Sequence, residues 1–275
     1  MYLITGANGQ LGRELRLLLP EDKAHFVTRQ ELDISNEKQV MDYISALHPT
    51  CIINCAAYTA VDRCEEEEDI AYRVNALGPQ YLAKAANDSK SKLIHISTDY
   101  VFDGTASPPY KQRDPTSPIN AYGRTKLAGE NFALSETDTI AIIRTSWLYS
   151  AFGKNFVSTM IRLGKEKNNI SVVADQMGTP TNAADLAQAI LTIAPQLTKQ
   201  HSGIYHFSNE GQATWYEFAC EIMRLGKLDC QVQPIPSDQF PTPALRPAYS
   251  LLDKSKIKMT FGIKIQQWEK SLGKI

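Results

Sequence analysis

The chain begins with Tyr2-Leu3-Ile4-Thr5-Gly6-Ala7-Asn8-Gly9-Gln10-Leu11-Gly12, and this segment predicts the architecture of the N-terminal half of the protein. Its first four residues form an apolar run typical of a buried strand, and the rest is a G-x-x-G-x-x-G loop. Leucines then recur at helical spacing until Pro20 ends the pattern. A strand, a glycine loop and a helix in this order predict a dinucleotide site, because glycines let the backbone approach a pyrophosphate at the helix N-terminus. No Gly-Lys-Ser or Gly-Lys-Thr comes after the loop, which argues against a phosphate loop for ATP.

Strand-like apolar runs alternate with helical patterns from the glycine loop to about residue 150. The further strands we expect are His25–Thr28, Cys51–Ala57, Lys92–Ser97 and Thr139–Arg144. We expect Ser35 to cap the second helix, and Asn75-Ala76-Leu77-Gly78-Pro79 to interrupt a later one. Alternation of this kind implies an α/β fold, a Rossmann-type doubly wound parallel sheet with helices on both faces.

The alternation of strands and helices becomes less regular after Trp147, where a smaller C-terminal substrate-binding lobe is expected. Its predicted elements are helices at Asn155–Lys167, Ala183–Ile193 and from a capping box at Thr214, and strands at Ile170–Ala174 and Gly203–Ser208. We therefore expect a dinucleotide-binding domain at residues 1–150 and a lobe at residues 151–275. Residues 183–208 are expected to return to the main sheet.

Composition excludes several classes of function. The chain of 275 residues is 43% hydrophobic and 21% charged, with a net charge of −1, so no basic surface indicates nucleic acid or anionic membrane as a partner. Five cysteines and five histidines are scattered without metal-ligand spacing, so we expect no metal site and reduced thiols. No apolar run reaches membrane length and no signal peptide is recognisable, which favours a cytoplasmic protein.

The choice of dinucleotide depends on the end of the second strand. An NAD site usually has an acid there, whereas this chain has Thr28-Arg29-Gln30. The Arg29 guanidinium suits a 2′-phosphate, which favours NADPH with NADH tolerated, although a solvated surface arginine is equally compatible. Asp33 and Ile34, expected just beyond a short third strand, would line the adenine pocket.

Tyr122 and Lys126 form the pattern that indicates chemistry. Four residues apart on a helix, they share one face. An ammonium beside a phenol favours the phenolate, which lowers the phenol pKa and makes it a better proton relay. The pair is weak evidence alone, and its place downstream of a glycine loop gives it weight.

Several further blocks resemble one known family. They are Asn54-Cys55-Ala56-Ala57-Tyr58-Thr59, Ala60-Val61-Asp62, Ser97-Thr98-Asp99-Tyr100-Val101-Phe102, Arg144-Thr145-Ser146-Trp147, Asp175-Gln176-x-Gly178-x-Pro180-Thr181 and Arg246-Pro247. With the glycine loop and Tyr122-x-x-x-Lys126, the chain resembles the extended short-chain dehydrogenase/reductases, and within them the dTDP-4-dehydrorhamnose reductases. The blocks run from residue 4 to about residue 250, and are specific in combination.

The resemblance implies a reaction and a set of site residues. The reaction is reduction of the C4 ketone of dTDP-4-dehydro-L-rhamnose to dTDP-L-rhamnose, a precursor of surface polysaccharide, by hydride from a nicotinamide cofactor. By resemblance Tyr122 donates a proton to the developing alkoxide, Lys126 holds the nicotinamide ribose and lowers the pKa of Tyr122, and Thr98 hydrogen-bonds the substrate oxygen. Cofactor-lining positions are Gly6, Asn8, Gly9, Gln10, Leu11, Ala56, Ala57, Tyr58 and Ser97. Substrate-side positions are Asp62, Asp99, Tyr100, Trp147, Asn155, Phe156 and Arg246, with Trp147 in stacking or apolar contact and Arg246 at the diphosphate.

Alternatives stay open at this point. Another nucleotide-sugar 4-ketoreductase, an epimerase or a 4,6-dehydratase would share the fold, but dehydratases of this class carry Thr-Asp-Glu where this chain has Thr98-Asp99-Tyr100. A non-catalytic subunit similar to the beta subunit of methionine adenosyltransferase is a further alternative, which intact Thr98, Tyr122 and Lys126 argue against. The resemblance also allows a homodimer.

Overall fold

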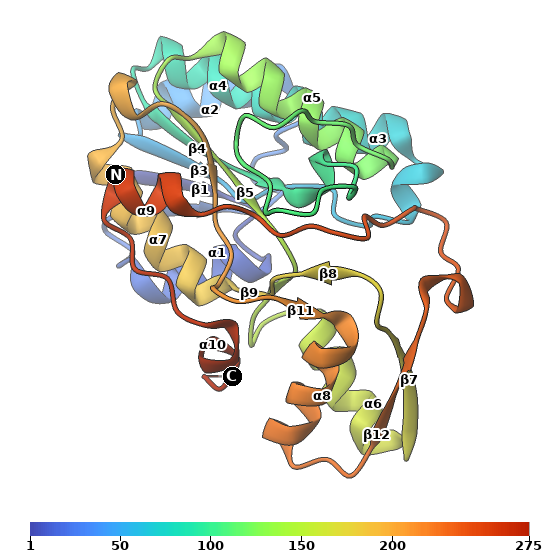
Figure 1. The fold of residues 1–275 in the computed structure, drawn as a ribbon. Coiled ribbons are helices and arrows are strands. Elements are labelled where there is room, and N and C mark those ends of the chain that lie inside the picture. The colour runs from blue at the N-terminus through green and yellow to red at the C-terminus, as the bar shows by residue number, and fades with distance from the viewer. Residues whose placement is uncertain (275) are drawn as a thin grey trace.

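A six-stranded parallel sheet forms the centre of the molecule, in the computed structural model that describes residues 1–274 (Figure 1). Its strand order is β10-β5-β4-β3-β1-β2. The strands are β1 (Tyr2–Thr5), β2 (Ala24–Val27), β3 (Cys51–Asn54), β4 (Lys92–Thr98), β5 (Ile140–Thr145) and β10 (Gly203–His206). Because β2 lies on one side of β1 and β3 on the other, the chain changes direction at β1. In open α/β sheets, such a switch point places a ligand crevice at the carboxyl ends of the strands.

Helices cover both faces of this sheet, as the alternation of the sequence predicts (Figure 1). One face carries α1 (Gln10–Leu18), α7 (Ala183–Gln196) and α9 (Ser255–Phe261), which pack with Ile4 and Ile53 in one buried cluster. The other face carries α2 (Glu37–Leu47), α4 (Gly78–Asp88) and α5 (Ala121–Glu136), which pack with Leu3 and Ile52. Adjacent strand residues such as Leu3 and Ile4 thus point to opposite faces. The α/β class expected from the sequence is confirmed.

A lobe lies below the carboxyl ends of the strands in Figure 1 and has a core of its own. Its main elements are α6 (Phe156–Glu166), β7 (Asn169–Val173), α8 (Trp215–Gly226) and β12 (Gln231–Ile235), with β7 and β12 paired in parallel. Short strands connect it to the sheet: β6 (Leu148–Tyr149), β8 (Met177–Gly178), β9 (Thr181–Asn182) and β11 (Ala213–Thr214). The capping box expected at Thr214 is present, with Glu217 as its partner.

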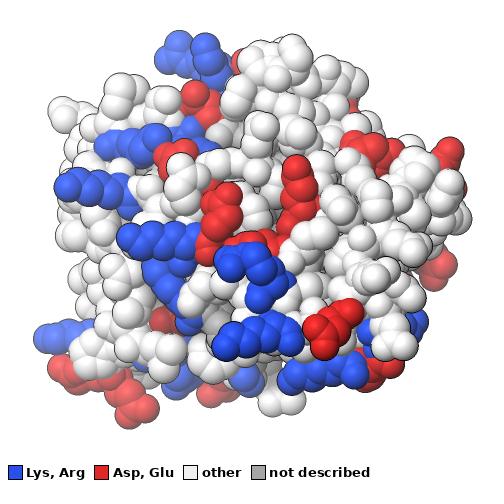
Figure 2. Space-filling model, turned by 60° about the horizontal axis from the view of Figure 1, so that its bottom comes forward, with Lys and Arg blue, Asp and Glu red and all other residues white. Residues whose placement is uncertain are grey.

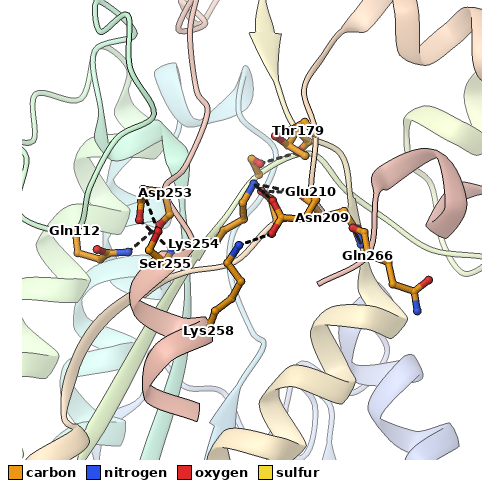
Figure 3. Close-up of polar contacts among 12 residues, drawn as sticks. Gln112, Thr179, Asn209, Glu210, Asp253, Lys254, Ser255, Lys258 and Gln266 are labelled. Atoms are coloured by element: carbon orange, nitrogen blue, oxygen red, sulfur yellow. Dashed lines mark hydrogen bonds and ion pairs between the residues drawn. The ribbon is translucent and has the colours of Figure 1, made fainter. Parts of the chain in front are cut away.

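The C-terminal segment returns from the lobe to the sheet and is fixed there by a polar cluster (Figure 3). Lys254 donates to the Asn209 carbonyl oxygen at 3.1 Å and pairs with Glu210 at 3.5 Å. Lys258 of α9 pairs with the same carboxylate at 2.6 Å. This cluster joins the end of β10 to α9, and α10 (Trp268–Leu272) lies beyond it in the chain.

Three local expectations differ from the structure. No third strand lies between β2 and Asp33: the segment is a turn, in which Glu31 accepts from the backbone N–H and hydroxyl of Thr28, both at 2.8 Å. Asn36, rather than Ser35, caps α2 through its contact with Gln39. The expected interruption at residues 75–79 is a π-helical segment at Arg73–Leu77, which continues α3 (Glu68–Tyr72) into α4.

The remaining single turns are η1 (Arg63–Glu65), η3 (Asp99–Val101), η4 (Lys199–His201) and η5 (Ser237–Gln239). Within residues 1–274, no helix is both long and apolar enough to cross a membrane. On the face that Figure 2 shows, basic and acidic side chains lie intermixed rather than in one patch of either sign.

Candidate active site

A cavity of about 1130 Å³ lies at the carboxyl ends of the central strands. Its walls come from the glycine loop, from the segments after β2, β3, β4 and β5, from α5, and from Trp215 of the lobe. All fourteen residues that the sequence predicts for the cofactor line this one cavity, among them Arg29, Asp33, Tyr122 and Lys126. A single cavity can therefore hold a dinucleotide with its nicotinamide end near the phenol.

The glycine loop leaves no room for side chains. Gly6 has φ +67°, and a Cβ there would lie 2.7 Å from the Ala56 backbone nitrogen. A Cβ on Gly12 would lie 2.5 Å from the Gly6 carbonyl oxygen. Gly9 is the N-cap of α1 and places no side chain over the first turn, so that turn presents free N–H groups to the cavity. These features fit a dinucleotide pyrophosphate at the helix N-terminus.

Arg29 follows β2, the edge strand of the sheet, and its side chain is mostly exposed. Its Nε is 3.3 Å from Asp33 Oδ2, while Ser35 donates its N–H and hydroxyl to Asp33 Oδ1 at 3.0 and 2.7 Å. Burial opposes ionisation of Asp33, but these hydrogen bonds and the charge of Arg29 outweigh it and hold the Asp33 pKa below its usual value. Exposed ion pairs contribute little, so the pair with Asp33 leaves Arg29 able to contact an anion instead.

Tyr122 and Lys126 occupy the first two turns of α5, which begins at the Asn120 N-cap. Burial raises the pKa of Tyr122, the Asp99 charge raises it further, and a hydrogen bond with Thr98 only partly offsets these effects. Lys126 Nζ donates to the Ile96 carbonyl oxygen at 2.6 Å, and burial lowers the Lys126 pKa to about 8. The expectation that Lys126 lowers the Tyr122 pKa is therefore wrong for this arrangement, because desolvation of the phenolate dominates. A phenol that keeps its proton suits the donor in a reduction.

Asp99 comes directly after β4 and is 2% exposed. Thr98 donates its hydroxyl to Asp99 Oδ1 at 3.0 Å and accepts from the Tyr100 N–H at 3.2 Å. Burial raises the pKa of Asp99 from 3.8 to about 7. A carboxyl group that titrates near neutrality thus lines the cavity beside Tyr122.

The elevated Asp99 pKa predicts a pH-dependent effect of Asp99→Asn on stability. Between the unfolded and folded pKa values the folded protein binds more protons, so the contribution of this group falls as the pH rises toward about 7. Asparagine stays neutral and avoids that loss. We expect the melting temperature of Asp99→Asn, relative to the unmutated protein, to increase from about pH 5 to about pH 8. Differential scanning fluorimetry measures this, with exposed Asp238→Asn as control; an unchanged difference would contradict the assignment.

The residues predicted for the substrate side divide into two groups. Thr98, Asp99, Tyr100, Trp147 and Asn155 line the cavity, whereas Asp62, Phe156 and Arg246 do not. Arg246 binds both carboxylate oxygens of Asp62, at 2.8 and 2.9 Å. Asn155 caps α6 and donates to Gln10 Oε1 at 3.0 Å, which joins the lobe to the glycine loop. Substrate contacts by these residues stay predictions.

Three features of the site were not predicted. Trp215 stacks on Trp147 with ring centroids 3.6 Å apart. Glu130 and Arg144 form an ion pair at 2.6 Å, and their side chains are 0% and 2% exposed. The Glu130 carboxylate also accepts a hydrogen bond from the Ser97 hydroxyl. Lys154 lines the cavity as an exposed cation. Only Trp215 had a signal in the sequence, because it is a tryptophan at the start of a capped helix. The Glu130–Arg144 pair and the position of Lys154 depend on contacts between distant segments.

Metal ligands do not gather anywhere in the described part of the chain, since residues 1–274 hold no group of three His, Cys, Asp or Glu side chains suited to an ion. All five cysteines are free thiols. Burial raises the pKa of Cys55, beside the cavity, to about 12. That thiol therefore stays protonated and is a poor nucleophile.

The sequence profile of one family, described as the RmlD substrate binding domain, matches residues 1–275. The chain belongs to this family. It is 42% identical to a dTDP-4-dehydrorhamnose reductase of Aggregatibacter actinomycetemcomitans over 285 residues, covering 99% of this chain and 97% of the relative. A dTDP-4-keto-6-deoxy-D-glucose reductase of Streptomyces niveus is 41% identical, covering 98% and 94%.

Solved structures of RmlD relatives agree with this fold. The crystal structure of a dTDP-4-dehydrorhamnose reductase from Bacillus anthracis, in complex with NADP, has a TM-score of 0.95 to this chain. It is 41% identical in sequence, and the match covers 99% of this chain and 97% of that one. Since coverage is nearly complete on both sides, the sheet and the lobe of this chain both have counterparts in the family.

Proposed function

We propose that this protein reduces the C4 ketone of dTDP-4-dehydro-L-rhamnose to dTDP-L-rhamnose, with NADPH as the hydride source. One observation carries the proposal: Thr98, Tyr122 and Lys126 line the same cavity as the glycine loop, in a chain that belongs to the RmlD family along its whole length. The protein is accordingly an oxidoreductase of the extended short-chain dehydrogenase/reductase type.

The glycine loop and the cavity residues around it would hold the dinucleotide. Gly6, Gly9 and Gly12 give its pyrophosphate access to the α1 N-terminus, and Ala56 and Ala57 supply a wall of small side chains. Lys126 would hold the nicotinamide ribose. When bound, the nicotinamide supplies the hydride.

Tyr122 would provide the proton. The phenol keeps its proton at neutral pH, because burial and the Asp99 charge disfavour the phenolate. As negative charge develops on the ketone oxygen, the phenol donates its proton there and the Thr98 hydroxyl offers a second donor.

The sugar nucleotide would lie between the sheet and the lobe. Tyr100, Trp147 and Asp99 line this half of the cavity and offer an aromatic surface and a hydrogen-bond acceptor. We assign dinucleotide binding to residues 1–150, with 183–208 completing the sheet at β10, and sugar-nucleotide binding mainly to residues 151–275.

Arg29 provides a test of cofactor preference. If its guanidinium binds the 2′-phosphate, Arg29→Ala should raise the KM for NADPH by about tenfold and change the KM for NADH far less, since only NADPH carries that phosphate. Steady-state kinetics with both cofactors measure the difference. Lys23→Ala removes an exposed cation outside the cavity and serves as control. Equal losses with the two cofactors would refute the role.

A different 4-keto sugar is the second candidate substrate. The Streptomyces niveus relative, named for a keto-deoxyglucose, is about as similar to this chain as the rhamnose enzyme is. Dehydratase activity is less well supported, because Tyr100 stands where dehydratases have a glutamate, and an epimerase would show no net NADPH oxidation. A purely regulatory role would leave the arrangement of buried Thr98 and Lys126 with partly buried Tyr122 without a use.

The proposal is tested by NADPH oxidation with dTDP-4-dehydro-L-rhamnose and with other dTDP- and UDP-linked 4-keto sugars, with products identified by NMR. We expect the highest kcat/KM for the rhamnose precursor. A higher kcat/KM for another 4-keto sugar would keep the reductase and change its substrate. Absence of NADPH oxidation with every ketone, together with stable capture of a protein partner, would favour the regulatory alternative.

Two further properties belong to this proposal. A cytoplasmic location would give the enzyme its cofactor and nucleotide-sugar substrate. A homodimer is the predicted assembly, and sedimentation velocity would distinguish it from a monomer.

A further inference from the structure

Trp147 has a backbone conformation that its side chain disfavours. Its φ is +47°, a left-handed value that bulky residues rarely adopt and that persists only where the surroundings impose it. Trp147 comes directly after β5 and its flanking Ser146, and lines the cavity with Tyr122, Thr98 and Asp99. Something in the structure must therefore hold this indole over the site.

The Trp147 indole is held by Trp215 on one helix of the lobe and by Gly178 on β8. Trp215 stacks on Trp147, with centroids 3.6 Å apart and planes 10° from parallel. On β8, a Cβ added to Gly178 would lie 2.7 Å from Trp147 Cε2 and 2.8 Å from Cζ2, so the indole fills the space that a side chain would take. The Trp147 carbonyl oxygen also accepts from the Thr181 N–H at 3.2 Å.

Trp215 is itself held rigidly. It is the first residue of α8, next to the Thr214–Glu217 capping box that fixes the start of that helix. Phe156, the first residue of α6, packs on its ring at 4.6 Å, and Phe218 lies 6.3 Å away. The aromatic chain thus runs from two helix starts in the lobe to an indole at the end of the central sheet.

We infer that Trp215 is a positioning residue for the proposed ketone reduction: it clamps Trp147 so that its indole orders the sugar against Tyr122. The inference rests on the proposed function and extends it, because Trp215 acts through Trp147 rather than on the reacting atoms. Without the stack, Trp147 can relax to an ordinary backbone conformation and withdraw its ring from the sugar.

The consequence is a specific kinetic pattern. Loss of a stacked aromatic pair corresponds to about a tenfold fall in kcat/KM for the sugar nucleotide. The KM for NADPH should not change, because the glycine loop and Arg29 lie outside the aromatic chain. Trp215→Phe keeps an aromatic ring on Trp147 and should retain more activity than Trp215→Leu.

The experiment is a double-mutant cycle between Trp215→Leu and Trp147→Ala. If Trp215 acts through Trp147, adding Trp215→Leu to Trp147→Ala should cause no further loss of kcat/KM. Losses that multiply in the double variant, or a Trp215→Leu variant with unchanged kcat/KM, would overturn the inference. A parallel cycle with Trp215→Phe, which fills more of the space, keeps the test available if Trp215→Leu does not fold.

A spectroscopic measurement separates this inference from the activity itself. The chain has three tryptophans, so in Trp268→Phe the stacked Trp147 and Trp215 are the only indoles that remain. That variant should keep the near-ultraviolet circular dichroism of two coupled indoles, and Trp215→Phe should lose it; retention of the coupled signal would overturn the clamp. Absence of ketone reduction by the unmutated protein would refute the proposed function, whereas loss of coupling without any kinetic change would refute only the positioning role.

Discussion

Tyr122→Phe should lower kcat for the sugar ketone by about 10²- to 10⁴-fold, the range typical of losing a general acid. The reason is that only the phenol proton is removed, while the ring that packs at 5.8 Å from Tyr100 remains. NADPH affinity should stay nearly unchanged, since the glycine loop and Lys126 are intact. Stopped-flow NADPH oxidation measures turnover, and fluorescence titration measures cofactor binding.

A matched control for this prediction is Tyr100→Phe. Tyr100 lines the same cavity and packs against the Tyr122 ring in an edge-to-face arrangement, but has no assigned proton-transfer role. Loss of the Tyr100 hydroxyl should affect mainly the KM for the sugar nucleotide. Near-normal turnover in Tyr122→Phe, or an equal fall in both variants, would contradict the assignment of the proton to Tyr122.

The second large effect concerns the buried ion pair behind the site. Glu130→Gln should lower the free energy of unfolding by about 3–5 kcal/mol, because it leaves Arg144 charged, buried and without its counter-ion. Arg144 binds the carboxylate through Nε at 2.9 Å and Nη2 at 2.6 Å, and stacks over Phe102 at 5.1 Å. Urea unfolding monitored by circular dichroism measures the change.

Two comparisons control for this effect. Glu166→Gln breaks the exposed pair with Arg162 and should cost less than about 1 kcal/mol. Replacing both buried partners, as Glu130→Leu with Arg144→Met, should be less destabilising than Glu130→Gln alone, because no charge is then left unpaired. A Glu130→Gln protein as stable as the unmutated one would show that the pair contributes nothing.

Local sequence patterns were enough to predict the parts of the site that depend on neighbours along the chain. The glycine loop, its strand and its helix are adjacent in sequence, and the spacing of Tyr122 and Lys126 follows from one helix. The capping box at Thr214 was predicted for the same reason. The alternation of strands and helices predicted the parallel sheet, since few topologies accommodate it.

Contacts between distant segments could not be predicted. No local pattern indicates that Arg246 pairs with Asp62, 184 residues away, or that Trp215 stacks on Trp147. Asp33 and Ile34 were predicted beyond a third strand, where Glu31 instead closes a turn. The pKa of Tyr122 was misjudged because spacing predicts that Lys126 is near, but not that its ammonium donates to Ile96 or how strongly burial acts.

The central claim is hydride transfer from NADPH to the C4 ketone, and isotope labelling tests it most directly. The protein would be incubated with dTDP-4-dehydro-L-rhamnose and NADPH doubly deuterated at the nicotinamide C4, and the product analysed by NMR and mass spectrometry. We predict dTDP-L-rhamnose with a single deuterium at C4 of the sugar and one NADP⁺ formed for each product. An unlabelled sugar, or isomerisation without net cofactor oxidation, would contradict the account.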